Sequence, residues 1–173
     1  MATKIVILAA ILSSARTLPA DLDAVYEQVS AYCGVPSDIL YAVSLVESGR
    51  WREGKNAPWP WTLNIEGKGY YFATREAMFE QVMAAISEKR SVDIGPMQTN
   101  WHWKFEQLGS PWKATEPVFN IKTGCQIIRA LYEKHGDWWV AVGKYHRESD
   151  APRHQRAAAQ YSARVYKEWE RLR

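Results

Sequence analysis

The chain has 173 residues, of which 47% are apolar and 24% charged, a length and composition typical of one globular domain with a buried core. Its net charge is only +3, and it contains neither a basic run nor an RNA-binding motif, so a nucleic-acid-binding protein is not expected. The 9 Trp and 9 Tyr residues suit a protein core and also the aromatic lining of a sugar-binding groove.

The first residues are typical of a secretory signal peptide. Lys4 supplies a positive charge, residues 5–12 are apolar, and residues 13–15 are small, as at a cleavage site. The apolar run is too short to span a bilayer, although a buried first strand would have the same pattern. We expect a signal peptide over residues 1–15, or up to residue 20, a mature domain over residues 21–173, and a periplasmic protein without a stable membrane span.

Two helices are predicted next. Apolar residues recur at helical spacing from residue 22 to Cys33, where Gly34 stops the pattern. A second helix is expected to begin with Ser37 as its N-cap and to end at Gly49.

The second helix carries an acidic residue on its apolar face. Leu40, Val43, Ser44 and Glu47 are spaced i, i+3, i+4 and i+7, so their side chains share one face. Glu47 is therefore expected to point inward from the last turn, where the helix dipole is negative. Burial and the dipole both raise the pKa of a carboxylic acid, so Glu47 can stay protonated near neutral pH and act as a general acid. The alternative is a solvent-exposed Glu at a frayed helix end.

The rest of the chain predicts a small β-hairpin and more helices, giving a mainly α (α+β) fold class. Residues 51–60 are expected to be a loop, and residues 61–65 and 70–72 flank a Gly-containing turn. Further helices are expected to begin at or near five residues, of which Thr74 and Asp137 are expected N-caps. The five are Thr74, Trp101, Asn120, Asp137 and Pro152.

The chain has two cysteines, so only one intramolecular pairing exists. In an exported protein, Cys33 and Cys125 can form a disulfide. The four histidines lack the spacing of metal ligands, and we expect neither a metal nor another cofactor. These histidines are His102, His135, His146 and His154.

Four motifs resemble, in this order, the soluble lytic transglycosylases, which share the lysozyme-like fold with goose-type lysozymes. The family pattern is Glu-Ser at a helix end, Gly-(Leu)-Met-Gln-x-Asn, Ala-x-x-Tyr-Asn, and a late Tyr on the final helix. Each motif alone is weak, but four in order over roughly residues 25–170 are specific together. They appear here as Glu47-Ser48, Gly95-Pro96-Met97-Gln98-Thr99-Asn100, Ala141-Val142-Gly143-Lys144-Tyr145-His146 and Tyr161.

Two residues depart from the family pattern. Pro96 stands where Leu is usual, and His146 replaces the usual Asn, which puts any role of that Asn in doubt. The Trp-Pro-Trp-Thr-Leu-Asn segment and the Gly-Tyr-Tyr-Phe segment after it resemble the branch associated with conjugation, type IV secretion or pilus systems.

The resemblance implies cleavage of the β-1,4 bond between N-acetylmuramic acid and N-acetylglucosamine, with formation of 1,6-anhydromuramic acid. Glu47 would serve first as the acid and then as the base. Implied partners are peptidoglycan glycan strands and components of a secretion or conjugation apparatus. Tyr145 is expected to hydrogen-bond Glu47, and a similar role is expected of Tyr161, with core packing as the alternative for both. Gln98 and Asn100 would either bind sugar or hold their loop in place. The implied substrate-binding residues are Ser48, Met97, Gln98, Asn100, Tyr145 and Tyr161.

Other functions are open at this point. If Asp93 faced the cleft, it could position a water molecule and make the enzyme a hydrolytic lysozyme. The favoured interpretation of Asp93 is a loop-capping residue that accepts hydrogen bonds from nearby backbone N–H groups. Glu53 and Glu66 are expected in exposed loops or turns. A non-catalytic, glycan-binding module is a third possibility.

Overall fold

The computed structural model describes residues 22–52 and 54–173, so the expected signal peptide and Glu53 lie outside the described residues. Helices dominate and the strands form small antiparallel sheets, which confirms the expected mainly α (α+β) class. The helices are α1 (Leu22–Cys33), α2 (Ser37–Ser48), α3 (Arg75–Ser87), α4 (Trp101–Leu108), α5 (Pro111–Ala114), α6 (Pro117–His135), α7 (Trp138–His146) and α8 (Pro152–Arg171). The strands are β1 (Gly49–Arg52), β2 (Lys55–Pro58), β3 (Thr62–Ile65), β4 (Lys68–Tyr71), β5 (Val92–Ile94) and β6 (Thr99–Asn100).

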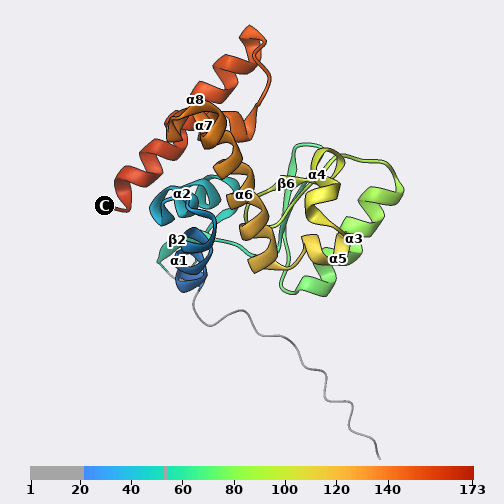
Figure 1. Ribbon diagram of the computed structural model, residues 1–173. Helices are drawn as coiled ribbons and strands as arrows, with labels where there is room; N and C mark the ends of the chain where they lie inside the picture. Colours follow the sequence, from blue (N-terminus) through green and yellow to red (C-terminus); the bar gives the residue numbers. More distant parts are fainter. Residues whose placement is uncertain (1–21, 53) are drawn as a thin grey trace, which may run out of the picture.

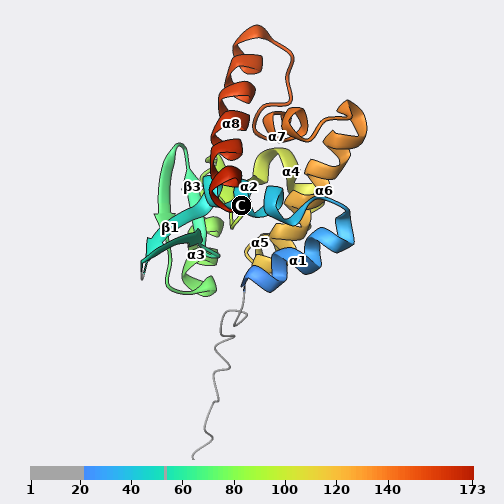
Figure 2. The ribbon, with the colours of Figure 1, turned by 90° about the vertical axis from the view of Figure 1, so that its left-hand side faces the viewer.

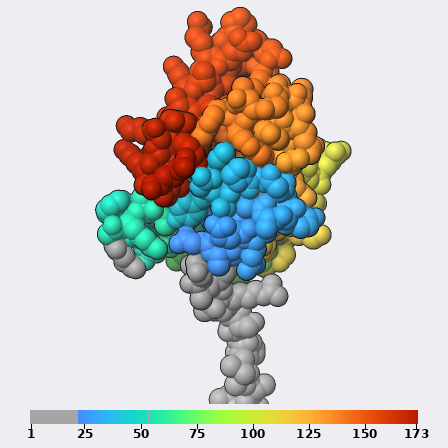
Figure 3. Space-filling model, turned by 60° about the vertical axis from the view of Figure 1, so that its left-hand side comes forward, coloured from blue at the N-terminus to red at the C-terminus, as the bar shows by residue number. Residues whose placement is uncertain are grey.

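Helix α6 runs through the middle of the molecule. Helices α1, α2, α7 and α8 lie on one side of it, and the larger sheet with α3, α4 and α5 lies on the other (Figure 1). Each side has its own buried apolar cluster, one shared by α1, α2, α6 and α8 and the other between the sheet and α3. The final helix α8 packs along α2, and Figure 3 shows its C-terminal part, in dark red, beside the blue and cyan helices.

The larger sheet has the strand order β4-β3-β5-β6, and every neighbouring pair is antiparallel. Leu63 and its partner Ile94 are buried in the cluster against α3. Because side chains alternate along a strand, the neighbouring pair Asn64 and Asp93 points to the opposite face. The β3–β4 hairpin confirms the one expected from the sequence. The alternation of side chains along β5 places the Asp93 carboxyl on the face opposite to Ile94.

A second, two-stranded sheet occupies residues that were expected to form a loop. Strand β1 pairs antiparallel with β2, and the pair lies at the side of the molecule in Figure 2. The prediction was wrong because the segment lacks apolar alternation. Cation–π contacts support it instead, since the guanidinium groups of Arg50 and Arg52 lie 5.0 and 4.8 Å from the Trp59 ring centre.

The start of α2 differs from the sequence expectation, and its end agrees with it. Ser37 is the first helical residue rather than the cap, and the preceding Pro36 makes no side-chain capping bond. Gly49 does end the helix, but with an ordinary φ of −56° rather than a left-handed one. Glycine is required there by space, because a Cβ atom would lie 2.3 Å from the carbonyl oxygen of Leu45.

Helix α6 begins at Pro117, three residues before the expected start at Asn120. The Glu116 carboxylate accepts hydrogen bonds from the backbone N–H groups of Val118 and Phe119, which caps the helix earlier. Asn120 therefore lies within the first turn, fully buried. The expected caps Thr74 and Asp137 are confirmed by their hydrogen bonds to helix N–H groups.

The expected disulfide is present and joins α1 to α6. Cys33 and Cys125 have Cα atoms 6.3 Å apart and are separated by 92 residues in the chain. The bridge ties the N-terminal helix to the central one and closes a long loop that includes the larger sheet. None of the described helices is long and apolar enough to cross a membrane.

Reduction of the Cys33–Cys125 bridge is expected to lower the free energy of unfolding by about 3–5 kcal/mol, because it releases a long loop in the unfolded chain. Urea titrations with and without dithiothreitol measure the difference. The Cys33→Ser, Cys125→Ser double variant is the control and should match the reduced protein, with no response to dithiothreitol. Equal stability of oxidised and reduced protein would contradict the prediction.

Candidate active site

The loop between β5 and β6 is fixed to α2 through a single carbonyl oxygen. The hydroxyl groups of Ser44 and Ser48 each donate to the carbonyl oxygen of Pro96 at 2.9 Å. Tyr26 of α1 is bonded to the Ser44 hydroxyl in turn, with the two oxygens 2.6 Å apart. All three of these side chains are buried, so the loop cannot shift without breaking bonds that water does not replace.

Asn120 holds the next part of the same loop and was not singled out from the sequence. Its Oδ1 accepts from the backbone N–H of Met97 at 2.9 Å, and its Nδ2 donates to the carbonyl oxygen of Ile94 at 2.8 Å. Gly95 makes this approach possible, because its φ is +75° and a Cβ atom would lie 2.6 Å from the Asn120 Cγ. The available signal was an amide at the start of the apolar face that runs through Ile121 and Cys125.

Glu47 lies beside this clamped loop, in the last turn of α2. Its Oε1 accepts a hydrogen bond from the Tyr161 hydroxyl of α8 at 2.5 Å. Burial raises the pKa of Glu47 from an ordinary 4.5 to about 7; the Tyr161 bond opposes this rise, and the negative charge of Asp93 adds to it. A partly buried carboxyl with this pKa exchanges a proton near neutral pH, as a general acid and base must.

Of the two tyrosines expected to hydrogen-bond Glu47, one does so and the other does not. Tyr145 was expected to hydrogen-bond Glu47, but its hydroxyl donates to the carbonyl oxygen of Met97 at 2.7 Å. Tyr161 is the residue that reaches Glu47. The prediction for Tyr161 is confirmed, because α8 packs along α2 and brings its hydroxyl to the acid. The prediction for Tyr145 was wrong because α7 packs on α6 and brings its hydroxyl to the loop.

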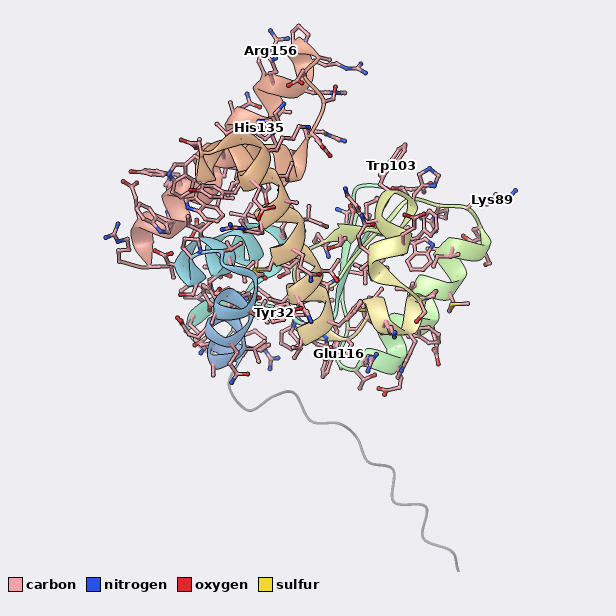
Figure 4. The ribbon with its side chains drawn as sticks, in the orientation of Figure 1. Tyr32, Lys89, Trp103, Glu116, His135 and Arg156 are labelled. Carbon is pink, nitrogen blue, oxygen red and sulfur yellow. A yellow bond between two sulfur atoms is a disulfide. The ribbon has the colours of Figure 1, made fainter. Side chains whose placement is uncertain are left out.

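Glu47 opens onto a cleft of about 860 Å³ between the two sides of the molecule. One wall comes from the larger sheet and α4, and the other from α6, α7 and the segment that leads into α8. Figure 4 shows both walls with their side chains. Polar and charged groups dominate the lining, which includes Glu47, Asn64, Ser91, Asp93, Gln98, Asn100, Lys104, Tyr145, His146, Arg147 and His154.

Asp93 belongs to this cleft, and the expectation that it caps a loop was wrong. It lies in strand β5, and the alternation of the sheet turns its carboxyl toward the cleft. Burial raises the pKa of Asp93, and the Asn100 hydrogen bond and the Arg147 charge oppose the rise. The Asn100 bond is 2.6 Å long. Asp93 and Glu47 are thus two carboxyl groups in one cleft, close enough for the charge of Asp93 to raise the pKa of Glu47.

The remaining predicted site residues divide into those that reach the cleft and those that lie beneath it. Gln98 lines the cleft, and its amide donates to the carbonyl oxygen of Gly95 at 2.9 Å, which leaves its amide oxygen as an acceptor. Asn100 also lines it while bonding Asp93. Ser48 of α2 and Met97 of the loop itself are buried and do not line the cleft, so the structure does not place them to bind substrate directly.

His146 lies at the edge of the cleft and supports Tyr161. Its ring stacks on the Tyr161 ring with centres 4.6 Å apart and planes 5° from parallel. Burial lowers the pKa of His146, and the charges of Arg147 and Arg164 lower it further. These effects favour the neutral form of the His146 imidazole, which stacks on Tyr161.

Within residues 22–52 and 54–173, no group of three or more histidine, cysteine, aspartate and glutamate side chains is placed to hold a metal ion. Comparison of the chain with models of protein families, with curated proteins and with solved structures found no match. The structure itself defines a mainly α protein with a polar cleft, and the Glu47 carboxyl in that cleft has a pKa of about 7.

Substitution of Glu47 by Gln is expected to stabilise the protein at high pH and leave its stability unchanged at low pH. The pKa of Glu47 is higher in the folded chain than in the unfolded one, so the wild type loses stability as pH rises from about 4.5 to about 7. The amide carries no charge at any pH, so the variant should gain on the order of 1–3 kcal/mol at about pH 8 and nothing at about pH 4.

Urea unfolding of both chains at the two pH values measures this difference. A variant that is less stable than the wild type by the same amount at both pH values would show that Glu47 contributes packing and hydrogen bonds but no buried charge.

Proposed function

We propose that this protein is a peptidoglycan lytic transglycosylase. The observation that carries the proposal is the Glu47 carboxyl, which opens onto a polar cleft, is bonded to Tyr161 and has a pKa of about 7. The four motifs that resemble the family supply the substrate class, namely the β-1,4 bond between N-acetylmuramic acid and N-acetylglucosamine.

In the proposed reaction, the protonated Glu47 gives its proton to the glycosidic oxygen as the bond from that oxygen to the muramyl anomeric carbon breaks. The substrate N-acetyl group stabilises the positive anomeric centre. The Glu47 carboxylate then takes the proton of the muramyl 6-hydroxyl, whose oxygen bonds to the anomeric carbon. The product is a 1,6-anhydro sugar, and Glu47 ends protonated, as it began. The 6-hydroxyl is the nearest nucleophile in the substrate, which gives it a high effective concentration.

The proposed place of action is the periplasm, where the enzyme would open the wall locally for a secretion or conjugation apparatus. This part of the proposal rests on the export signal expected at the N-terminus and on the segment from Trp59 to Phe72 that resembles the secretion-associated branch. A bound cofactor has no part in the reaction as written, because Glu47 and the substrate supply every proton and nucleophile.

A second candidate is a hydrolytic lysozyme, and the position of Asp93 favours it specifically. Asp93 shares the cleft with Glu47 and raises its pKa, as a second carboxyl group that positions water would. The hydrogen bond from Asn100 holds the Asp93 carboxyl in place. A non-catalytic glycan-binding module is the third candidate, and any wall-lytic activity excludes it.

Digestion of purified peptidoglycan is expected to release muropeptides with 1,6-anhydro ends, lighter by one water molecule than hydrolysed products and resistant to borohydride. Mass spectrometry before and after borohydride treatment measures both properties. The Glu47→Gln variant is the control and should lose activity at least about a hundredfold, because one acid/base group is removed.

Products that borohydride reduces, and whose mass includes one added water molecule, would identify the enzyme as a hydrolase and not a transglycosylase. In that case, Asp93→Asn should lose about as much activity as Glu47→Gln, whereas in the transglycosylase it should lose far less. Near-normal lysis by Glu47→Gln would remove both enzymes from consideration.

The rate of wall lysis is expected to fall as pH rises through about 7, because Glu47 must be protonated for the first step. Tyr161→Phe should move this fall to higher pH, since the lost hydrogen bond stabilises the Glu47 carboxylate. Initial rates of peptidoglycan solubilisation across the pH range measure the shift. Tyr145→Phe is the matched control, because its hydroxyl bonds the loop and not the acid. A shift to lower pH in Tyr161→Phe would contradict the assignment.

A further inference from the structure

Trp103 is an exposed aromatic side chain at the rim of the polar cleft. It is 74% exposed, more than any other large hydrophobic side chain in the part of the chain that the structure describes. Figure 4 shows it projecting from the end of α4, away from the sheet. Exposure alone does not mark a binding residue, but Trp103 also lines the cleft, so its indole face is available to a ligand bound there.

The position of Trp103 is fixed relative to the carboxyl groups of the cleft. Asn100 accepts a hydrogen bond from the backbone N–H of Trp103 at 3.3 Å through Oδ1, and donates to Asp93 at 2.6 Å through Nδ2. The helix then kinks at Lys104, which has a non-helical φ of −130°. The backbone of Trp103 is thus held by the same amide that bonds Asp93, which fixes the place on the cleft rim from which the indole projects.

The surroundings of Trp103 suit a sugar ring. A pyranose has an apolar C–H face and a rim of hydroxyl groups, so it needs an aromatic face with polar groups at the edge. Lys104 and Arg147 line the same cleft and place positive charge beside it, and the Arg147 charge acts on Asp93. A lipid would need a continuous apolar lining, which this polar cleft lacks. A nucleic acid would bring phosphates toward Glu47 and Asp93.

We propose that the indole face of Trp103 stacks on one pyranose ring of the glycan and helps set the specificity of the cleft. The substrate class in this inference, a glycan strand, is taken from the function proposed above. The proposed stacking gives Trp103 a contact that none of the four motifs contains. Trp103 should therefore govern binding of the glycan and leave the acid/base step at Glu47 unchanged.

The test measures binding apart from catalysis. An N-acetylglucosamine tetramer is titrated into the inactive Glu47→Gln protein by calorimetry, alone and combined with Trp103→Ala. Loss of the stacked ring should weaken binding about tenfold, and Trp103→Phe should keep most of the affinity. Trp51→Ala is the matched control, since Trp51 is 71% exposed but lies outside the cleft. Phe105→Ala tests another exposed aromatic residue of α4.

Activity on peptidoglycan gives an independent measurement. In the otherwise wild-type chain, Trp103→Ala should raise KM about tenfold with kcat nearly unchanged, and its melting temperature should equal that of the wild type. Equal affinity of the Trp103→Ala and parent proteins, or no binding of the tetramer at all, would overturn the inference while leaving the proposed function intact. Trp103-dependent binding without wall lysis would instead overturn the enzyme and leave the stacking site.

Discussion

The backbone of Pro96 and Met97 is the point on which the site depends. Two serine hydroxyls of α2 reach one carbonyl oxygen, the Asn120 amide of α6 reaches the next N–H, and the Tyr145 hydroxyl of α7 reaches the next carbonyl oxygen. Three helices that are distant in sequence thus converge on two residues. Buried hydrogen bonds of this kind are costly to break singly, because each broken bond leaves a polar group without water.

This convergence explains how the protein can keep a carboxyl group in an unfavourable place. Glu47 is next to Ser48, so the bonds that hold the loop also hold the last turn of α2. Without that support, the helix end could fray and let the carboxyl return to water, where its pKa would be ordinary. The loop is in this sense a structural support for the acid, and the stability lost by burying the acid is offset by packing elsewhere in the core.

The sequence predicts the elements that depend on a local residue pattern. Prediction fails where contacts between residues distant in the chain determine the orientation of a side chain. The inward position of Glu47, the β3–β4 hairpin and the disulfide follow from helical spacing, turn residues and the cysteine count. Asp93 was misjudged because its face is set by pairing with Asn64, a partner far away in the chain. Tyr145 was misjudged for a similar reason, since Tyr145 and Tyr161 both carry a hydroxyl on a late helix and only helix packing determines that Tyr161 alone bonds Glu47. The β1–β2 pair lacks apolar alternation and depends on arginine–tryptophan contacts that no periodicity indicates.

One consequence concerns where the chain can change in length. Helix α2 carries the acid at Glu47 and the loop-binding hydroxyls at Ser44 and Ser48, so their mutual orientation is set by the helical repeat alone. A residue inserted among them would turn the following side chains by about 100° and separate the acid from the clamped loop. The turn at Gly67 between β3 and β4 has open space around it, and additions there would disturb no buried bond. Natural or engineered length variation should therefore collect at that turn and be absent from α2.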